Sequence, residues 1–319
     1  VRRLIIDAVP EVLKSSIGVG IGLFIAFIGL KNSGIVVADE TNFVALGNVT
    51  AAGPLLAIIG LIVAGFLMVR RFKGAFAVSI IAITVAAMAL GISQVPTSVG
   101  DVVSLSSIGA IQETFLAMDL AGAFAYGIFS IIFTFTVVEL FDNTATLLGL
   151  SRRAGLVDEN GKIPNLGRAL TSDSIGVMGS AALGSTALNA YIENASGIAE
   201  GGRTGLKALV VAVGFALALV FAPLVTVIPA VATAPILILV GALMLAEVRN
   251  LSFDDYTDVI PAFLTIIMMP LTFSIAEGLA FGFVSYALLK LLTGRWRETH
   301  WMTYVIGVAF LINFWMLTH

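Results

Sequence analysis

The sequence contains no cysteine and only two histidines among its 319 residues. Without cysteine, a disulfide framework and a thiolate metal site are excluded. The two histidines, His300 and His319, both lie near the C-terminal end of the sequence. A buried histidine metal site or a histidine proton relay is therefore not expected elsewhere in the chain. We predict no metal site and no cofactor.

Charged residues are also scarce. Asp, Glu, Lys and Arg make up 12% of the chain, and the mean hydropathy is +1.05. A soluble domain of ordinary composition is roughly one quarter charged. The net charge of −3 is small and indicates no nucleic-acid partner. The low charge and high hydropathy predict an all-α polytopic membrane protein whose partner is the lipid bilayer.

Long apolar runs recur along the whole chain, and a helix that crosses the hydrocarbon core needs roughly 17–25 such residues. The apolar segments are 15–37, 53–69, 75–92, 121–149, 169–184, 206–228, 231–248, 258–273, 275–292 and 301–317. The last of these is expected to be a terminal span or a helix in the membrane interface. The chain begins at Val1 with no signal-peptide pattern, and we interpret it as a fragment that lacks an N-terminal portion.

The distribution of Lys and Arg predicts the orientation, because these residues mark cytoplasmic connections. They gather in 70–73, 150–168 and 203–207, whereas 38–52 and 93–120 contain none. Connections with and without basic residues alternate along the chain, as cytoplasmic and outer connections should. This alternation requires the chain between 185 and 202 to return through the membrane, although it is too short and polar for a full span. We predict a short extended piece at 188–192 followed by a half-helix at 193–202.

A weak internal repeat relates 9–30 to 228–249. Pro10 aligns with Pro229, and Gly22 aligns with Gly241. The first copy has a basic residue near its start and the second has one at its end, so the copies would cross the membrane in opposite directions. This pattern predicts an inverted-topology repeat.

Carboxylates at membrane depth are costly, by roughly 2.5–3.5 kcal/mol for Asp on insertion scales, and usually mark function. Asp142 lies ten residues before Arg152, which corresponds to about 15 Å along a helix and places Asp142 near the midplane. Thr146 is one turn further on the same face, and Glu139 lies on a partly shared face. Glu193 opens the predicted half-helix, between Ile192 and Asn194.

Two midplane carboxylates suit a planar ligand rich in N–H donors. Asp142 and Glu193 are also the expected proton carriers, with Glu139 as a third candidate, so that a proton gradient would serve as the coupling ion. The predicted substrate-binding residues are Asp142, Glu193, Thr146, Ile192 and Asn194.

Four stretches of the sequence resemble those of a known transporter family. The stretches ELFDNTATLLGL, LGRALTSDS, YIENASG and GGRTGL, all within 139–206, resemble the purine permeases of the nucleobase–cation symporter 2 (xanthine/uracil permease) family, in the branch that carries adenine, guanine and hypoxanthine. Asn143 and Ala145 replace the Thr and Gly that usually follow the first acid, and Asn194 replaces a Ser. These departures leave the exact nucleobase open.

The resemblance implies an inverted repeat of roughly 7+7 transmembrane helices, with a core domain that carries substrate and a gate domain. It implies that about the first four helices are missing from this chain. Residues 1–95 would be gate helices of the first repeat, 96–228 core helices of the second repeat, and 229–319 gate helices of the second repeat with the C-terminal segment. Asp142 and Glu193 would be the two substrate-binding acids.

The expected function is therefore import of a purine base by proton symport in the plasma or inner membrane, with a homodimer left open. The alternatives are a carrier of uracil, xanthine or a small anion on the same fold. An intramembrane protease would need paired Asp residues, and the H-E-x-x-H motif of a zinc protease is absent. A scaffold protein would not need costly midplane carboxylates. The chain is not expected to be an enzyme.

Overall fold

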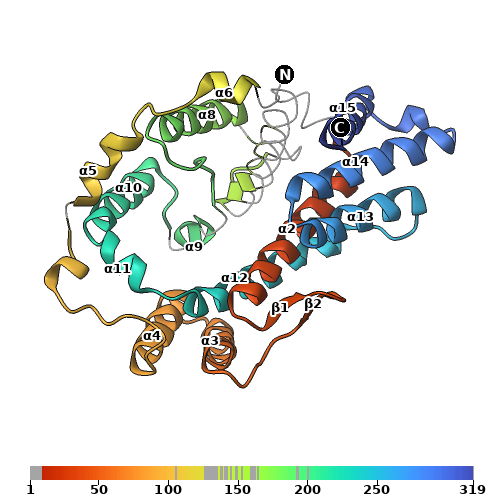
Figure 1. Ribbon diagram of the computed structural model, residues 1–319. Coiled ribbons are helices and arrows are strands. Elements are labelled where there is room, and N and C mark those ends of the chain that lie inside the picture. Colours follow the sequence, from red (N-terminus) through yellow and green to blue (C-terminus); the bar gives the residue numbers. More distant parts are fainter. Residues whose placement is uncertain are drawn as a thin grey trace. The chain divides into compact units, whose positions relative to one another are not determined.

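A computed structural model of the chain is shown in Figure 1. The structure describes residues 9–104, 106–125, 136, 139, 143, 146, 147, 150, 151, 154–158, 163, 165–191, 194–199 and 201–318. The chain divides into two compact units. Unit 1 comprises Val1–Ile6 and Val102–Ala222, and unit 2 comprises Asp7–Asp101 and Pro223–His319. The roles of core and gate for these parts of the chain stay a prediction.

Both units are built mainly of helices. The elements of unit 2 are α2 (Glu11–Asn32), β1 (Val36–Asp39), β2 (Phe43–Leu46), α3 (Ala52–Val69), α4 (Ala75–Ala89), η1 (Val99–Asp101), α12 (Ala230–Met244), η2 (Leu245–Asn250), α13 (Tyr256–Thr272), α14 (Ile275–Leu292), η3 (Trp296–Glu298) and α15 (Trp301–Thr318). Those of unit 1 are α5 (Ser106–Thr114), α6 (Leu120–Ala125), α8 (Leu166–Ala182), α9 (Asn194–Ala199) and α10 (Gly205–Val220), and α11 (Ala222–Val227) begins at the boundary.

Several helices are long and apolar enough to cross a membrane. Among the described residues these are Glu11–Asn32, Ala52–Val69, Ala230–Asn250 and Ile275–Leu292, and shorter apolar helices lie at Ala75–Ala89, Gly205–Val220, Tyr256–Thr272 and Trp301–Ile312. The prediction of a multi-pass helical membrane protein is confirmed.

The first span begins and ends earlier than predicted. We predicted it over 15–37, but α2 runs from Glu11 to Asn32 and Gly34 adopts a φ of +73°. The chain then forms an antiparallel hairpin in which Val36 pairs with Leu46 and Asp39 with Phe43. The Asp39 carboxylate accepts hydrogen bonds from two backbone N–H groups of the turn, at 3.0 and 2.7 Å. This side-chain turn closes the hairpin, which we did not predict.

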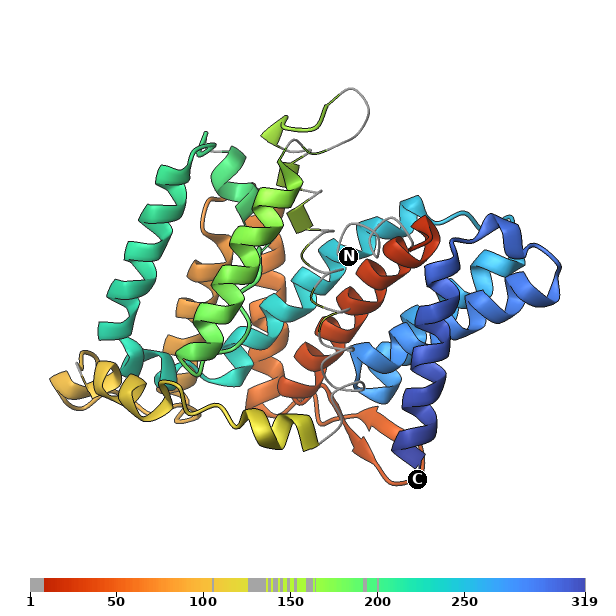
Figure 2. The ribbon, with the colours of Figure 1, turned by 90° about the horizontal axis from the view of Figure 1, so that it is seen from above.

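Helices α2 and α12 lie side by side in both views of unit 2 (Figures 1 and 2). A Cβ atom added at Gly22 would lie 2.9 Å from the Gly241 carbonyl oxygen, and one added at Gly241 would lie 2.7 Å from the Ala26 Cβ. On either side of this crossing, Gly29 approaches Ala234 and Gly18 approaches Glu247, which lies in η2 directly after α12. The contacts therefore run in opposite order along the two helices, which pack closely only because glycine stands where their backbones meet.

The helix contacts of unit 2 follow a reciprocal pattern. Helix α2 packs against α13 and α14, and α12 packs against α3 and α4. Helices α3 and α4 pack against each other, as do α13 and α14. Exchanging α2, α3 and α4 with α12, α13 and α14 leaves this set of contacts unchanged. Helix α15 stands outside the exchange and packs against α14.

A charged network closes one end of the α13–α14 hairpin. Lys290, in the last turn of α14, is only 2% exposed. Its ammonium lies 2.9 Å from a carboxylate oxygen of Asp258, 3.7 Å from Asp255 and 3.6 Å from Glu298. Arg295 forms ion pairs with Asp255 and Glu298. The buried lysine is thus surrounded by acids, as a charge removed from water requires.

The stability of unit 2 should depend on acid pH through this network. The backbone and side-chain hydrogen bonds of Thr257, followed by Arg295, hold the pKa of Asp255 well below its usual range, and Arg295 lowers the pKa of Glu298. Carboxylates with depressed pKa values stabilise the fold above their unfolded pKa of about 4, and this stabilisation is lost as the pH falls through the folded pKa. We expect the melting temperature to fall in acid, and to fall less steeply in Asp255→Asn.

The measurement is thermal unfolding of the detergent-solubilised protein across an acid pH series. Asp254→Asn is the matched control, because Asp254 is exposed and its carboxylate accepts only from Ser252 among the hydrogen bonds found in the described residues. A pH dependence of Asp255→Asn that runs parallel to that of the wild type would contradict the assignment.

Candidate substrate site

The chain between α8 and α10 is broken, as predicted from its polar composition. Helix α8 ends at Ala182, Gly184 adopts a φ of +71°, and residues 185–191 carry no regular secondary structure. The helix α9 then covers Asn194–Ala199 and is followed by Gly201 with a φ of +98°. The predicted half-helix is confirmed over these six residues. The predicted extended piece is non-helical, and its described residues form no strand.

The end of α8 is tied to the end of α5 within unit 1. The Leu116 N–H donates to the Ala182 carbonyl at 2.8 Å, and the Thr114 hydroxyl donates to the Leu183 carbonyl at 2.9 Å. These bonds satisfy carbonyl groups that the last turn of a helix leaves without intrahelical donors. They also fix the point at which the chain leaves α8 for the broken segment.

Asn194 begins α9 and turns its amide back onto the preceding chain. Its backbone N–H and its side-chain Nδ2 both donate to the Tyr191 carbonyl oxygen, each at 3.1 Å. One donor of the amide is therefore committed to local backbone, which is the ordinary structural role of Asn at a helix start. A contact of Asn194 with substrate stays a prediction.

Four described residues in the stretch that contains Asp142 share one helix face. Glu139, Asn143, Thr146 and Leu150 are helical and follow one another at intervals of three or four residues. Asn143 is 2% exposed, and neither its Oδ1 nor its Nδ2 has a hydrogen-bond partner in the part of the chain that the structure describes. An unpaired buried amide costs roughly 1–3 kcal/mol. This face is therefore polar where a membrane helix would ordinarily be apolar.

The two central acids of the prediction, Asp142 and Glu193, lie outside the described residues, and so does Ile192. Thr146, Asn194 and Glu139 are described, and all three are half-buried. Their proposed roles in substrate binding and proton coupling stay predictions. From the sequence, Asn143 was noted as a departure from the family pattern beside Asp142, but it was not counted among the predicted substrate-binding residues.

Lys207 was also missed. From the sequence we assigned it to a cytoplasmic connection and gave it no role at the site. In the structure its ammonium donates to the Asn194 carbonyl of α9 at 2.8 Å. The sequence offered only a weak signal, which was the two glycines, Gly197 and Gly202, that precede Lys207 at intervals of five residues.

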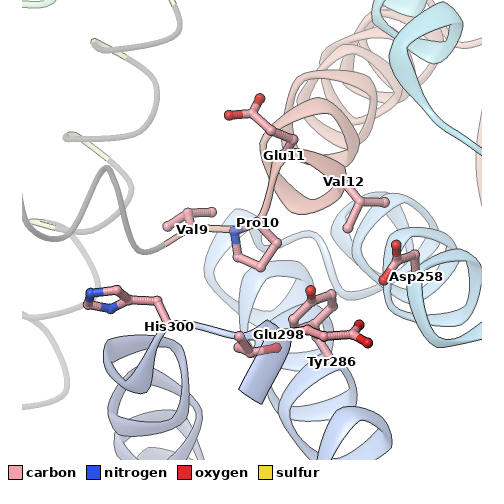
Figure 3. A pocket seen from close by; sticks show the side chains of 9 residues that line it. Val9, Pro10, Glu11, Val12, Asp258, Tyr286, Glu298 and His300 are labelled. Carbon is pink, nitrogen blue, oxygen red and sulfur yellow. The ribbon is translucent and has the colours of Figure 1, made fainter. Parts of the chain in front are cut away.

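A separate pocket of about 340 Å³ lies in unit 2, at the charged end of the α13–α14 hairpin. Figure 3 shows Val12 of α2, Asp258 of α13 and Tyr286 of α14 around it. Its lining includes none of the predicted substrate residues. The part of the chain that the structure describes contains no group of three or more His, Cys, Asp or Glu side chains that could hold a metal ion.

Comparison with known proteins identifies the family. The model of the permease family matches residues 1–281. The chain is 40% identical over 319 residues to the adenine permease AdeQ of Escherichia coli (strain K12), covering 98% of this chain and 69% of that protein. It is 40% identical over 322 residues to the guanine/hypoxanthine permease PbuO of Bacillus subtilis (strain 168), covering 99% of this chain and 73% of that protein.

A protein of Methanocaldococcus jannaschii, described as a permease without a stated substrate, is 45% identical over 314 residues, covering 98% of this chain and 71% of that protein. The family and these relatives are transporters, not enzymes, and the apolar helices agree with a multi-pass protein of the cell membrane. The chain belongs to the permease family, and within it to the nucleobase–cation symporter 2 group whose named relatives include adenine permeases and guanine/hypoxanthine permeases.

Proposed function

We propose that the protein imports purine nucleobases, namely hypoxanthine, guanine or adenine, by proton symport with alternating access. The observation that carries the proposal is its similarity, over nearly the whole chain, to relatives named adenine permease and guanine/hypoxanthine permease. The chain retains an acid in each of the two stretches LFDNTATLLGL and YIENASG.

The proposed site brings one helix and one broken segment to a purine base. Non-helical backbone is tolerated at membrane depth only where protein buries it or where it lines a cavity. The broken chain around α9 meets this condition if it faces a substrate cavity. Asp142 and Glu193 would each accept hydrogen bonds from N–H groups of the base, with Thr146, Ile192 and Asn194 around it.

The buried amide of Asn143 supports a polar cavity beside this helix. Its donor and acceptor have no partner among the described residues, and a planar heterocycle offers acceptors and donors side by side along one edge. On a helix face that contacts only lipid or apolar side chains, that amide would stay without hydrogen bonds, at a cost in free energy. The polar face of Glu139, Asn143 and Thr146 therefore favours a carrier over a scaffold.

The packing of unit 2 supports an inverted repeat. In a two-fold arrangement, equivalent positions meet at the axis and every other contact occurs twice. Gly22 and Gly241, which the sequence repeat aligns, contact each other, and the helix contacts of unit 2 are unchanged by the exchange described above. Pro10 and Pro229, also aligned, each precede the first residue of their helix.

Alternating access would then follow from motion of one compact unit against the other. Residues 102–222 carry both acids and would form the core, and the helices of unit 2 would form the gate. A carboxylate that changes its protonation state as the site changes sides would couple the movement of substrate to the proton gradient. Asp142 and Glu193 are the proposed carriers, with Glu139 as a further candidate.

Substrate and coupling can be tested in one uptake assay with the full-length protein. We expect a host strain that lacks its own purine uptake to accumulate labelled hypoxanthine, guanine or adenine when it expresses this protein. The uptake should stop when a protonophore collapses the proton gradient. Uracil and xanthine should compete weakly, because the named relatives are permeases for adenine or for guanine and hypoxanthine. Uptake of uracil or xanthine alone would favour the alternative carrier, and uptake that persists with the protonophore would remove proton symport.

A further inference from the structure

Lys207 reaches from one helix to another inside unit 1. It lies in the first turn of α10, and its Nζ donates to the backbone carbonyl of Asn194 in the first turn of α9, at 2.8 Å. Both helices are labelled in Figure 1. The neighbouring Leu206 and Leu209 are 68% and 65% exposed, whereas Lys207 is half-buried. The charged side chain is therefore turned inward while its apolar neighbours face outward.

Two glycines make room for this lysine. A Cβ atom at Gly197 would lie 2.5 Å from the Lys207 Cε and 2.9 Å from its Nζ. One at Gly202 would lie 3.0 Å from the Lys207 Cδ and 2.9 Å from the Gly197 carbonyl oxygen. The Gly202 N–H also donates to that carbonyl, at 2.9 Å. The turn after α9 is thus folded tightly around the lysine stem, and a larger residue at either position would displace it.

The contact fixes the residue directly after Glu193. Asn194 is held on one side by its two donors to the Tyr191 carbonyl and on the other by the Lys207 ammonium at its own carbonyl. Consecutive Cα atoms are about 3.8 Å apart across a trans peptide. Fixing Asn194 therefore restricts the direction in which the chain enters α9, where the predicted substrate acid stands.

We infer that Lys207 is a positioning residue of the substrate site. It ties α10 to the first turn of α9 and so holds the broken segment in the geometry that presents Glu193 to the base. A hydrogen bond from a charged donor is stronger than a neutral one, which suits a short helix with few contacts of its own. This inference rests on the proposed function, because it assigns Lys207 to the same site.

The alternative role of Lys207 is that of an ordinary cytoplasmic charge that sets topology. Arg203, four residues earlier in the same connection, is exposed and provides the matched control. If these charges act only on topology, removing the charge at Lys207 or at Arg203 should have the same effect on purine binding. A positioning residue would differ from Arg203 and would tolerate replacement by another long cation.

The experiment measures binding of labelled purine to the purified full-length protein, together with its uptake kinetics. For Lys207→Met we expect Kd to rise about tenfold, equivalent to about 1.4 kcal/mol, with the maximal uptake rate within about twofold of wild type. Lys207→Arg should stay within about threefold of wild type because it keeps a positively charged donor on a long side chain, and Arg203→Met should leave Kd unchanged.

Unchanged binding by Lys207→Met, or equal weakening by Arg203→Met, would overturn the inference. Absence of any purine binding by the wild type would instead refute the proposed function, and the positioning role would fall with it. These outcomes are distinguishable because the first two require a wild type that binds.

A double-mutant cycle tests the contact itself without any ligand. Gly197→Ala should be less favourable for the melting temperature in the wild type than in a Lys207→Ala background, because the three nearest atoms to the added Cβ all belong to Lys207. An equal change in both backgrounds would show that Lys207 does not occupy the space beside α9, and the inference would be overturned.

Discussion

Replacing Asp142 by Asn, or Glu193 by Gln, is expected to abolish purine uptake while the protein still reaches the membrane. Each change removes the negative charge but keeps the shape of the side chain. Loss of one charged partner from a buried hydrogen-bonded pair costs roughly 2–5 kcal/mol, so uptake should fall about 30-fold or more. Because both acids are proposed to hold the same base, either change alone should be sufficient.

The measurement is uptake of labelled hypoxanthine, guanine and adenine, normalised to the amount of protein in the membrane. Glu113→Gln is a matched control, since Glu113 is an exposed carboxylate of the same unit near the end of α5. It should transport as the wild type does. Substantial uptake by Asp142→Asn or Glu193→Gln would mean that the replaced acid is not a substrate ligand. If neither change had an effect, the result would favour the interpretation that the protein is a scaffold.

Gly241→Ala is expected to destabilise unit 2 strongly, because the backbones of α2 and α12 leave no room for a side chain at their crossing. The added Cβ would contact the Gly22 carbonyl oxygen and lie 2.7 Å from the Ala26 Cβ. Backbone cannot rotate away as the end of a flexible side chain can, so the helices must separate. Overpacking of this kind typically costs about 1–3 kcal/mol, and leucine at the same position should cost more.

The matched control is Gly65→Ala in α3, where an added Cβ meets no heavy atom within 4 Å. There the change should be neutral or stabilising, because alanine is favoured over glycine in a helix interior by about 1 kcal/mol. Thermal unfolding in detergent provides the comparison. If Gly241→Ala and Gly65→Ala melted alike, the close crossing of α2 and α12, and with it the support for an inverted repeat, would be lost.

The membrane helices could be predicted well from the sequence because hydrophobic length is a strong local signal. The predicted spans 53–69 and 275–292 correspond to α3 at Ala52–Val69 and α14 at Ile275–Leu292. The β1–β2 hairpin was not predicted, since its apolar strands were divided between the end of the first span and a connection. Its turn depends on local hydrogen bonds of Asp39, which composition alone does not indicate.

The candidate site was predictable in part. The polar segment NAYIENASG indicated a broken helix, and α9 occupies Asn194–Ala199. Lys207 was not predicted as a site residue, because the loop-charge rule uses a Lys near a span only to assign the side of the membrane. Its actual environment depends on a tertiary contact with a carbonyl thirteen residues earlier. The reciprocal packing of the helices of unit 2 likewise requires three-dimensional contacts, since the sequence repeat aligned only Pro10 with Pro229 and Gly22 with Gly241.

The most direct test of the central proposal is an experimental structure of the full-length protein with a purine base bound. We expect the base to lie at the membrane midplane with the Asp142 and Glu193 carboxylates within hydrogen-bonding distance of its N–H groups, and the Lys207 ammonium on the Asn194 carbonyl. A base bound elsewhere, or either acid facing headgroup water or turned away from a shared cavity, would contradict it.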